Sequence, residues 1–124
     1  MTTTLLTAAF GALGVLSRYG ITRYGVRHFP DFPIGTLIAN LLGCFLIGAL
    51  AVLFREKQVL PAQLQLPVLA GFLGGFTTFS SFALETLNLI DQRGLTVSLA
   101  YSSASVFLGL VFCIAGMFLA RSLA

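Results

Sequence analysis

The sequence predicts an all-α membrane protein with four transmembrane helices in a chain of 124 residues. Its composition is 57% hydrophobic and only 9% charged, with a mean hydropathy of +0.98. Apolar residues fall into four runs, each near the roughly 20 residues that a helix needs to cross a bilayer. The few basic residues lie near the predicted ends of these runs. We expect spans at about residues 4–24, 34–54, 66–90 and 95–120, in a single domain over residues 1–124.

Composition also excludes several classes of function. Cys44 and Cys113 both lie inside apolar runs, so they are expected to be small packed side chains and not a disulfide framework. The first run lacks a basic flank and a cleavage site, which favours a span over a signal peptide. No nucleophile–base pair, metal-ligand cluster or phosphate loop is present, so we predict that the chain is not an enzyme. The net charge of +3 indicates contact with lipid headgroups, not nucleic acid.

The first span carries the small residues Gly11, Ala12 and Gly14, followed by the charged residue Arg18. Small residues let neighbouring helices approach closely. Arg18 falls between the membrane midplane and the far interface. It either snorkels to that interface or attracts an anion to the mouth of a pore, and its position supports both interpretations equally.

The second span contains a single amide, Asn40, on a stripe with Thr36 and Cys44. A small-residue packing face recurs beside it at four-residue spacing: Gly35, Ala39 and Gly43. Asn40 forms either a hydrogen bond between helices or a neutral donor that faces an anion path. Considered in isolation, Asn40 slightly favours the hydrogen bond between helices. A neutral donor would suit an anion path, because conduction requires that each site bind the ion weakly.

The third span is interrupted at its centre by the stretch Gly74–Thr78, which contains two glycines and two adjacent threonines. Glycine weakens a helix by about 1 kcal/mol per residue, and Thr offers competing local hydrogen bonds. We therefore predict a helix broken at mid-membrane, where freed carbonyls must be satisfied by protein, water or an ion. After the break, Phe79 and Phe82 share a face. Their ring edges are positive and can solvate an anion without a net charge, although a packing role is more common.

Two further polar groups are predicted in the spans. Glu85 is the one acid inside a span and is expected to pair with Thr36, because an intramembrane carboxylate is usually paired. A proton-coupled carboxylate is the alternative. The fourth span carries hydroxyls that form either a polar track or a small-residue interface: Ser98, Tyr101, Ser102 and Ser105.

The basic residues are almost evenly divided between the two sides of the predicted membrane. One side holds Arg55, Lys57 and Arg121, and the other holds Arg23, Arg27 and Arg93. The positive-inside bias that normally orients a chain is therefore nearly absent. We expect insertion in both orientations and an antiparallel, dual-topology homodimer. With the break on the two-fold axis, two carbonyls per chain provide four ligands for a hard monovalent cation such as Na⁺.

Three motifs, in this order along the chain, resemble those of the Fluc (CrcB) fluoride channels. They are Gly14 with Arg18 and Tyr19, the stretch 35–43 (GTLIANLLG), and the stretch 71–82 (GFLGGFTTFSSF). The resemblance implies passive, fluoride-selective efflux from the cytoplasm through two antiparallel pores per dimer in the bacterial cell (inner) membrane. It also implies a structural Na⁺ at the dimer centre, held by the backbone carbonyls of Gly74 and Thr77.

The same resemblance implies roles for individual side chains. Asn40 is expected to line the fluoride pathway, Phe79 and Phe82 to form an edge-on aromatic box, and Arg18 to stand in the vestibule. A polar track is expected to begin at Ser81 and continue along the fourth span at Tyr101, Ser102 and Ser105. Glu85 and Thr36 are expected to form a structural polar pair.

A small multidrug-type, dual-topology, proton-coupled antiporter is the main alternative function. That chemistry requires a carboxylate at the centre of an early span and an aromatic cage, usually with Trp. The first two spans contain no acid, and the chain contains no Trp. A third possibility, a non-transporting scaffold of small helices, leaves the Gly74–Thr78 interruption and the Phe pair without a purpose.

Overall fold

The computed structural model describes residues 1–123, and every regular element within them is helical. The long elements are α1 (Thr2–His28), α2 (Ile34–Ala51), α4 (Phe79–Arg93) and α5 (Leu95–Leu123). The short helix α3 (Leu73–Phe76) precedes α4. Three further helical turns lie between α2 and α3: the π-helical η1 (Val52–Glu56), the 3₁₀ turn η2 (Ala62–Leu64) and the π-helical η3 (Pro67–Phe72).

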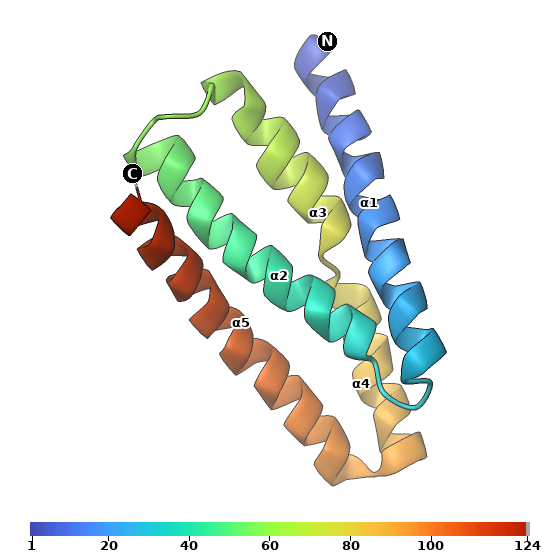
Figure 1. The fold of residues 1–124 in the computed structure, drawn as a ribbon. Helices are drawn as coiled ribbons and strands as arrows, with labels where there is room; N and C mark the ends of the chain where they lie inside the picture. Colours follow the sequence, from blue (N-terminus) through green and yellow to red (C-terminus); the bar gives the residue numbers. More distant parts are fainter. Residues whose placement is uncertain (124) are drawn as a thin grey trace.

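The helices form four passes that run side by side (Figure 1). These passes are Thr2–His28, Ile34–Glu56, Ala62–Arg93 and Leu95–Leu123, and each is long and apolar enough to cross a membrane. The second pass is central: α2 packs most extensively against α5 and also contacts α1 and α3. The start of α1 and the end of α5 lie at the same end of the bundle (Figure 1). The predicted number of spans therefore agrees with the structure.

The first helix is longer than predicted, since α1 continues to His28 and not to about residue 24. Gly25 does not end the helix; it serves as a packing contact with Gly35 instead. A Cβ added to Gly25 would collide with the backbone of Gly35 on α2. The helix stops only before Pro30, which forces the preceding residue, Phe29, out of the helical region (φ −136°, ψ 67°).

Glycines on facing helices allow the passes to pack backbone against backbone. Gly14 on α1 faces the carbonyl of Phe72, so close that a Cβ would overlap the oxygen. Gly48 on α2 faces the backbone of Cys113, and Gly116 on α5 faces Phe45 in the same way. Close approach of this kind is how helices associate where lipid removes the hydrophobic driving force.

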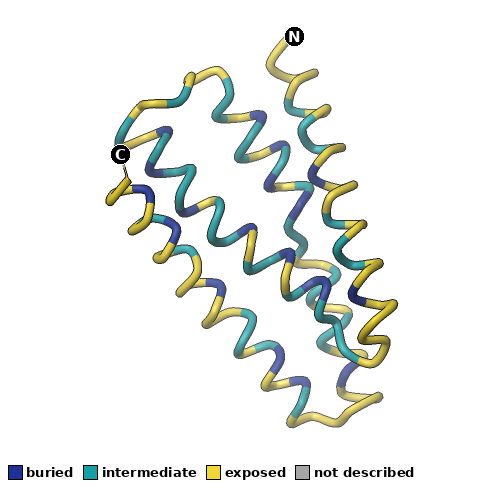
Figure 2. Tube along the Cα trace, in the orientation of Figure 1, coloured by how far each residue is buried: buried dark blue, intermediate teal, exposed yellow. Residues whose placement is uncertain are grey.

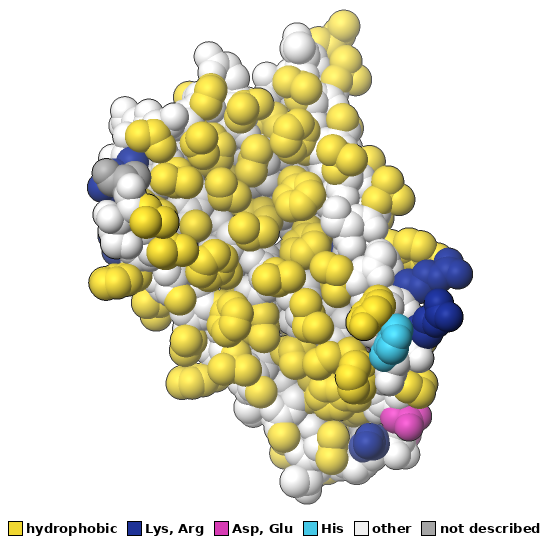
Figure 3. All heavy atoms as spheres, viewed as in Figure 1, with side chains coloured by type: hydrophobic (Ala, Val, Ile, Leu, Met, Phe, Trp, Pro, Cys, Tyr) yellow, Lys and Arg dark blue, Asp and Glu magenta, His cyan; other side chains and the backbone are white. Residues whose placement is uncertain are grey.

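The surface is apolar around the middle of the bundle and charged at its two ends. Figure 2 shows that residues buried in the chain lie along the facing sides of the helices, with exposed residues on the outside. Figure 3 shows hydrophobic side chains over most of one face, while Lys, Arg, Asp, Glu and His side chains gather at the ends. Large outward-facing apolar residues include Leu16, Leu84, Phe107 and Phe118. This distribution matches a protein whose solvent is a bilayer.

Candidate functional site

The third pass changes conformation at Thr77 and Thr78, between α3 and α4. Thr77 (φ −91°, ψ 157°) and Thr78 (φ −149°, ψ 122°) are both extended. Thr78 then caps the new helix, because its Oγ1 accepts a hydrogen bond from the backbone N–H of Ser81 at 3.2 Å. A Thr side chain at this position satisfies an N–H that the first turn of a helix leaves open.

The change of conformation leaves backbone carbonyls available. In a continuous helix the N–H of Thr78 would bond to Gly74 and that of Ser81 to Thr77. Here the Thr78 N–H donates to Asn40 Oδ1 at 2.8 Å, and the Ser81 N–H donates to the Thr78 hydroxyl. Within residues 1–123, no hydrogen bond reaches the carbonyl oxygen of Gly74 or Thr77.

The neighbouring carbonyl is satisfied by Arg18. Its Nε donates to the oxygen of Gly75 at 3.1 Å, across 57 residues of sequence. The predicted vestibule arginine therefore holds the end of α3 through one nitrogen. A guanidinium has five N–H donors, so most of its hydrogen-bonding capacity remains available.

Asn40 bonds to both backbone groups of Thr78. Its Nδ2 donates to the Thr78 carbonyl at 3.0 Å, while its Oδ1 accepts from the Thr78 N–H at 2.8 Å. The amide group has two N–H donors, so one is not used in this pair. Asn40 thus forms the helix–helix hydrogen bond expected from its residue type and retains a donor as well.

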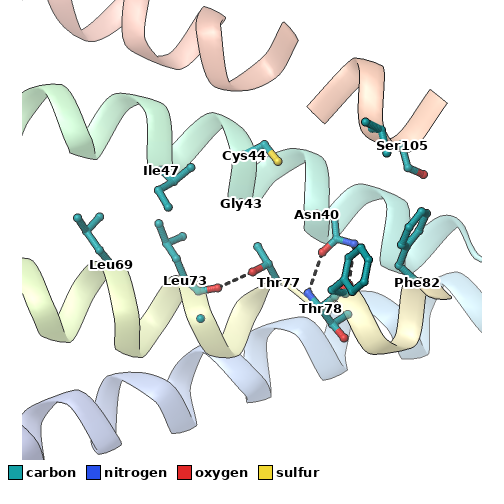
Figure 4. Close-up of a pocket in the computed structure, with 13 residues that line it drawn as sticks. Asn40, Gly43, Cys44, Ile47, Leu69, Leu73, Thr77, Thr78, Phe82 and Ser105 are labelled. Carbon is teal, nitrogen blue, oxygen red and sulfur yellow. Dashed lines mark hydrogen bonds between the residues drawn. The ribbon is translucent and has the colours of Figure 1, made fainter. Parts of the chain in front are cut away.

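A cavity of about 390 Å³ lies beside this pair, between α2, the third pass and α5 (Figure 4). It brings together six of the predicted functional residues: Gly74, Thr77, Asn40, Phe79, Phe82 and Ser105. Cys44, Thr78 and several aliphatic side chains complete the lining, which contains no charged residue. Figure 4 shows Asn40 reaching toward Thr78, with Phe82 beside it and Ser105 on the opposite side.

The two phenylalanines differ in their exposure. Phe79 is 80% exposed, whereas Phe82 is partly buried. Their ring centroids are 5.7 Å apart with the planes at 47°, so the rings are neither stacked nor perpendicular. Phe82 also lies 5.7 Å from the ring of Tyr101, which packs edge-on against Phe32. The aromatic group is therefore a run of four rings and not only a pair.

Glu85 accepts hydrogen bonds from two hydroxyls. Thr36 Oγ1, in a side chain that is only 2% exposed, donates to Oε1 at 2.8 Å. The Tyr101 hydroxyl donates to Oε2 at a longer 3.4 Å. A carboxylate accepts at both oxygens, so Glu85 links α2, α4 and α5 in one network.

The other predicted track residues are more scattered. Ser81 accepts a hydrogen bond from the Thr78 hydroxyl at 3.1 Å and does not line the cavity. Ser102 and Ser105 donate to carbonyls of their own helix, those of Leu99 and Tyr101. Of the predicted track, the cavity therefore includes Ser105 alone.

Sequence reasoning missed one polar residue at this site and did not predict the partner of another. Thr78 is a bonding partner of Asn40 and the cap of α4, a role indicated by a Thr directly before a helical run. Tyr101 was assigned to a track, although it bonds to Glu85. No local pattern identifies this second contact, because it joins residues on two different passes.

Taken together, four apolar passes and a cavity beside an extended segment define a multi-pass α-helical membrane protein. The chain belongs to the family described as "CrcB-like protein, Camphor Resistance (CrcB)", whose model matches residues 5–117. It is 44% identical over 115 residues to a protein of Pseudomonas putida, covering 92% of this chain and 93% of the relative. A protein of Paracoccus denitrificans is 43% identical over 122 residues (98% and 96% covered), and one of Rhizobium leguminosarum bv. trifolii is 40% identical over 121 residues (97% of each).

All three relatives are named "Fluoride-specific ion channel FluC". The family is thus one of ion channels and not of enzymes.

Proposed function

We propose that this protein is a fluoride-selective channel that lets F⁻ leave the cytoplasm passively across the bacterial inner membrane. The observation that carries the proposal is the cavity that groups Asn40, Phe79, Phe82 and Ser105 in a chain more than 40% identical to proteins named fluoride channels. The relatives cover nearly the whole chain, so the proposal extends to all four passes.

The chemistry of the cavity suits a small, strongly hydrated anion. Phenylalanine ring edges are weakly positive, and the unused Asn40 N–H is a neutral donor. Neither group holds an anion as tightly as a cationic side chain would, and rapid conduction requires weak binding at successive sites. The hydroxyl of Ser105 adds a further donor to the same lining. Arg18, whose guanidinium keeps free donors, attracts anions toward the vestibule.

The functional unit in this proposal is an antiparallel homodimer with two pores. The even division of Lys and Arg between the two ends favours insertion in both orientations. Phe79 is 80% exposed beside an open, apolar cavity, so a second subunit is needed to enclose it. In a two-fold arrangement each copy would supply the same surface to the other.

The residues present fit a structural Na⁺ on that two-fold axis. The carbonyls of Gly74 and Thr77 have no hydrogen-bond donor within residues 1–123, and Gly74 has open space beside it. In this proposal the α3–α4 interruption lies at mid-membrane, where free carbonyls need a partner. Two copies would present four neutral oxygens, a ligand type suited to a hard cation. A bound cation would compensate these dipoles and tie the two subunits together.

Reconstituted liposomes loaded with KF, with a fluoride electrode outside, provide the test. With valinomycin to carry K⁺, we expect rapid F⁻ release, and no Cl⁻ release from vesicles loaded with KCl. Flux that requires a proton gradient and moves organic cations would instead identify an antiporter. Absence of both fluxes from a folded, correctly reconstituted protein would refute a transport function.

A further inference from the structure

A second cavity lies at the end of the bundle where the second pass connects to the third. It has a volume of about 530 Å³ and lies next to the π-helical turn η1. Its lining is formed by six residues: Phe54, Arg55, Gln58, Leu60, Ala62 and Gln65. None of these residues takes part in the fluoride pathway proposed above, so the cavity needs a separate explanation.

The backbone at this cavity adopts costly conformations. Gln58 has φ of 52°, the one positive φ at a residue other than glycine within residues 1–123. The connection is nevertheless held in place: the N–H of Lys57 bonds to Val52 O at 2.9 Å and that of Val59 to Leu53 O at 3.1 Å. Single π-helical turns and left-handed residues occur often where a side chain is directed to a ligand. In this protein the π-helical turn and the left-handed Gln58 occur where Gln58 and Arg55 line the same cavity.

The charge at this cavity is positive because the nearby acid is already paired. Glu56 forms a two-bond ion pair with Arg121, with Nε donating to Oε2 at 2.8 Å. Arg55 forms no side-chain hydrogen bond or ion pair within residues 1–123. The lining contains no Asp or Glu. A guanidinium with two carboxamides therefore offers several N–H donors and a full positive charge.

This donor set and its location indicate the ligand. Arginine binds phosphate oxygens with its planar, forked donors. The cavity follows the pass that ends at Glu56 and precedes the pass that begins at Ala62, so it lies at the membrane boundary, where lipid phosphates are found. Phe54, Leu60 and Ala62 add an apolar wall for the glycerol and the upper acyl chain. We propose that Arg55, Gln58 and Gln65 bind a phosphate oxyanion at this boundary, supplied by a phospholipid headgroup.

Binding can be measured on the intact protein in a nonionic detergent. The probes are dihexanoylphosphatidylglycerol, inorganic phosphate and dihexanoylglycerol, which lacks the phosphate. Native mass spectrometry counts the bound lipid, and the thermal unfolding midpoint reports on the fold. We expect one phosphatidylglycerol per chain, competition by millimolar phosphate, and no saturable binding of dihexanoylglycerol.

Two variants separate the site from the fold. Arg55→Gln should weaken phosphatidylglycerol binding at least tenfold without unfolding the protein, because the side chain is exposed and unpaired. Gln58→Gly removes the carboxamide yet accepts the positive φ, so it should weaken binding while the unfolding midpoint stays the same or rises. Arg27→Gln, an exposed cation at the other end of the bundle, is the matched control.

The outcomes are distinct. Binding of inorganic phosphate alone, lost in Arg55→Gln, would support the oxyanion site and identify a soluble anion as its occupant. Equal phosphatidylglycerol binding by the parent, Arg55→Gln and Arg27→Gln would overturn the proposal, as would equally strong binding of dihexanoylglycerol. None of these results depends on which ion the protein conducts.

Discussion

The side-chain amide of Asn40 pairs with both backbone polar groups of Thr78, at 2.8 Å to its N–H and 3.0 Å to its carbonyl. A carboxamide matches a peptide group in this way, so the pair substitutes for the helical bonds that the extended Thr78 does not make. It also turns the Thr78 N–H away from Gly74, whose carbonyl accepts no hydrogen bond from any described residue. One residue on α2 thereby stabilises the interruption and lines the proposed anion path.

Replacing Asn40 with Asp tests its place in that path. The carboxylate still accepts from the Thr78 N–H, but it loses the donor to the Thr78 carbonyl and adds a negative charge. A like charge 4 Å from fluoride costs about 4 kcal/mol at an effective dielectric constant of 20, which predicts a roughly thousandfold loss of F⁻ flux. Liposome efflux measures the effect. Asn88→Asp, an exposed change on α4, should conduct normally; normal flux through Asn40→Asp would show that the amide only packs.

The aromatic box is tested by Phe79→Ile and Phe82→Ile. Isoleucine keeps much of the apolar volume but has no positive ring edge, so each change should reduce fluoride efflux at least tenfold. Size-exclusion profiles and unfolding midpoints should remain close to those of the parent protein. Phe118→Ile on α5, at a side chain that is 73% exposed and outside the cavity, is the matched control. Undiminished efflux in both box variants would exclude a role for the rings.

Glu85 is expected to be structural. In Glu85→Gln one accepting oxygen remains for Thr36 or Tyr101, while the new amide nitrogen faces the other hydroxyl. Hydrogen bonds to a charged group contribute about 1.5–3 kcal/mol and neutral ones about 1 kcal/mol, so the free energy of unfolding should fall by about 1–2 kcal/mol. Fluoride flux should stay within about threefold of the parent value. Abolished flux in a folded variant would place the carboxylate in the path, and a lost proton dependence would favour an antiporter.

Two glycines on α1 should respond oppositely to alanine. A Cβ on Gly14 would overlap the carbonyl of Phe72, whereas a Cβ on Gly20 meets no atom within 4 Å. Overpacking typically costs about 1–3 kcal/mol, so Gly14→Ala should lower the unfolding midpoint and separate α1 from the third pass. Gly20→Ala should be neutral or stabilising by up to about 1 kcal/mol through helix propensity. Thermal unfolding in detergent measures both, and equal midpoints would refute the close contact at Gly14.

The occupancy of Gly74 and Thr77 by Na⁺ is also testable. If these carbonyls hold the cation between two subunits, replacing Na⁺ by N-methylglucamine should lower the thermal midpoint and reduce the dimer fraction at low protein concentration. Titration of Na⁺ at constant ionic strength separates binding from general screening. A midpoint and dimer fraction that do not respond to Na⁺ would remove the cation from the proposal.

The sequence by itself determined the class of the protein and the number of its passes. Hydropathy is a property of consecutive residues, so it can be summed along the chain without knowing how helices pack. Small-residue spacing likewise identified the face of α2 that includes Ala39, which is fully buried in the structure. The end of α1 was misplaced because Gly25 resembles a helix stop, whereas it is a packing contact with Gly35.

Beyond the expected pair of Thr36 and Glu85, the tertiary structure decided which polar groups meet. Asn40 bonds to Thr78 across 38 residues, Arg18 to Gly75 across 57, and Tyr101 to Glu85 across 16. The rotation and depth of each helix set these pairs, and both follow from backbone contacts such as those at Gly14 and Gly48. A side chain's partners therefore depend on how neighbouring passes interlock, information that no single run of residues contains.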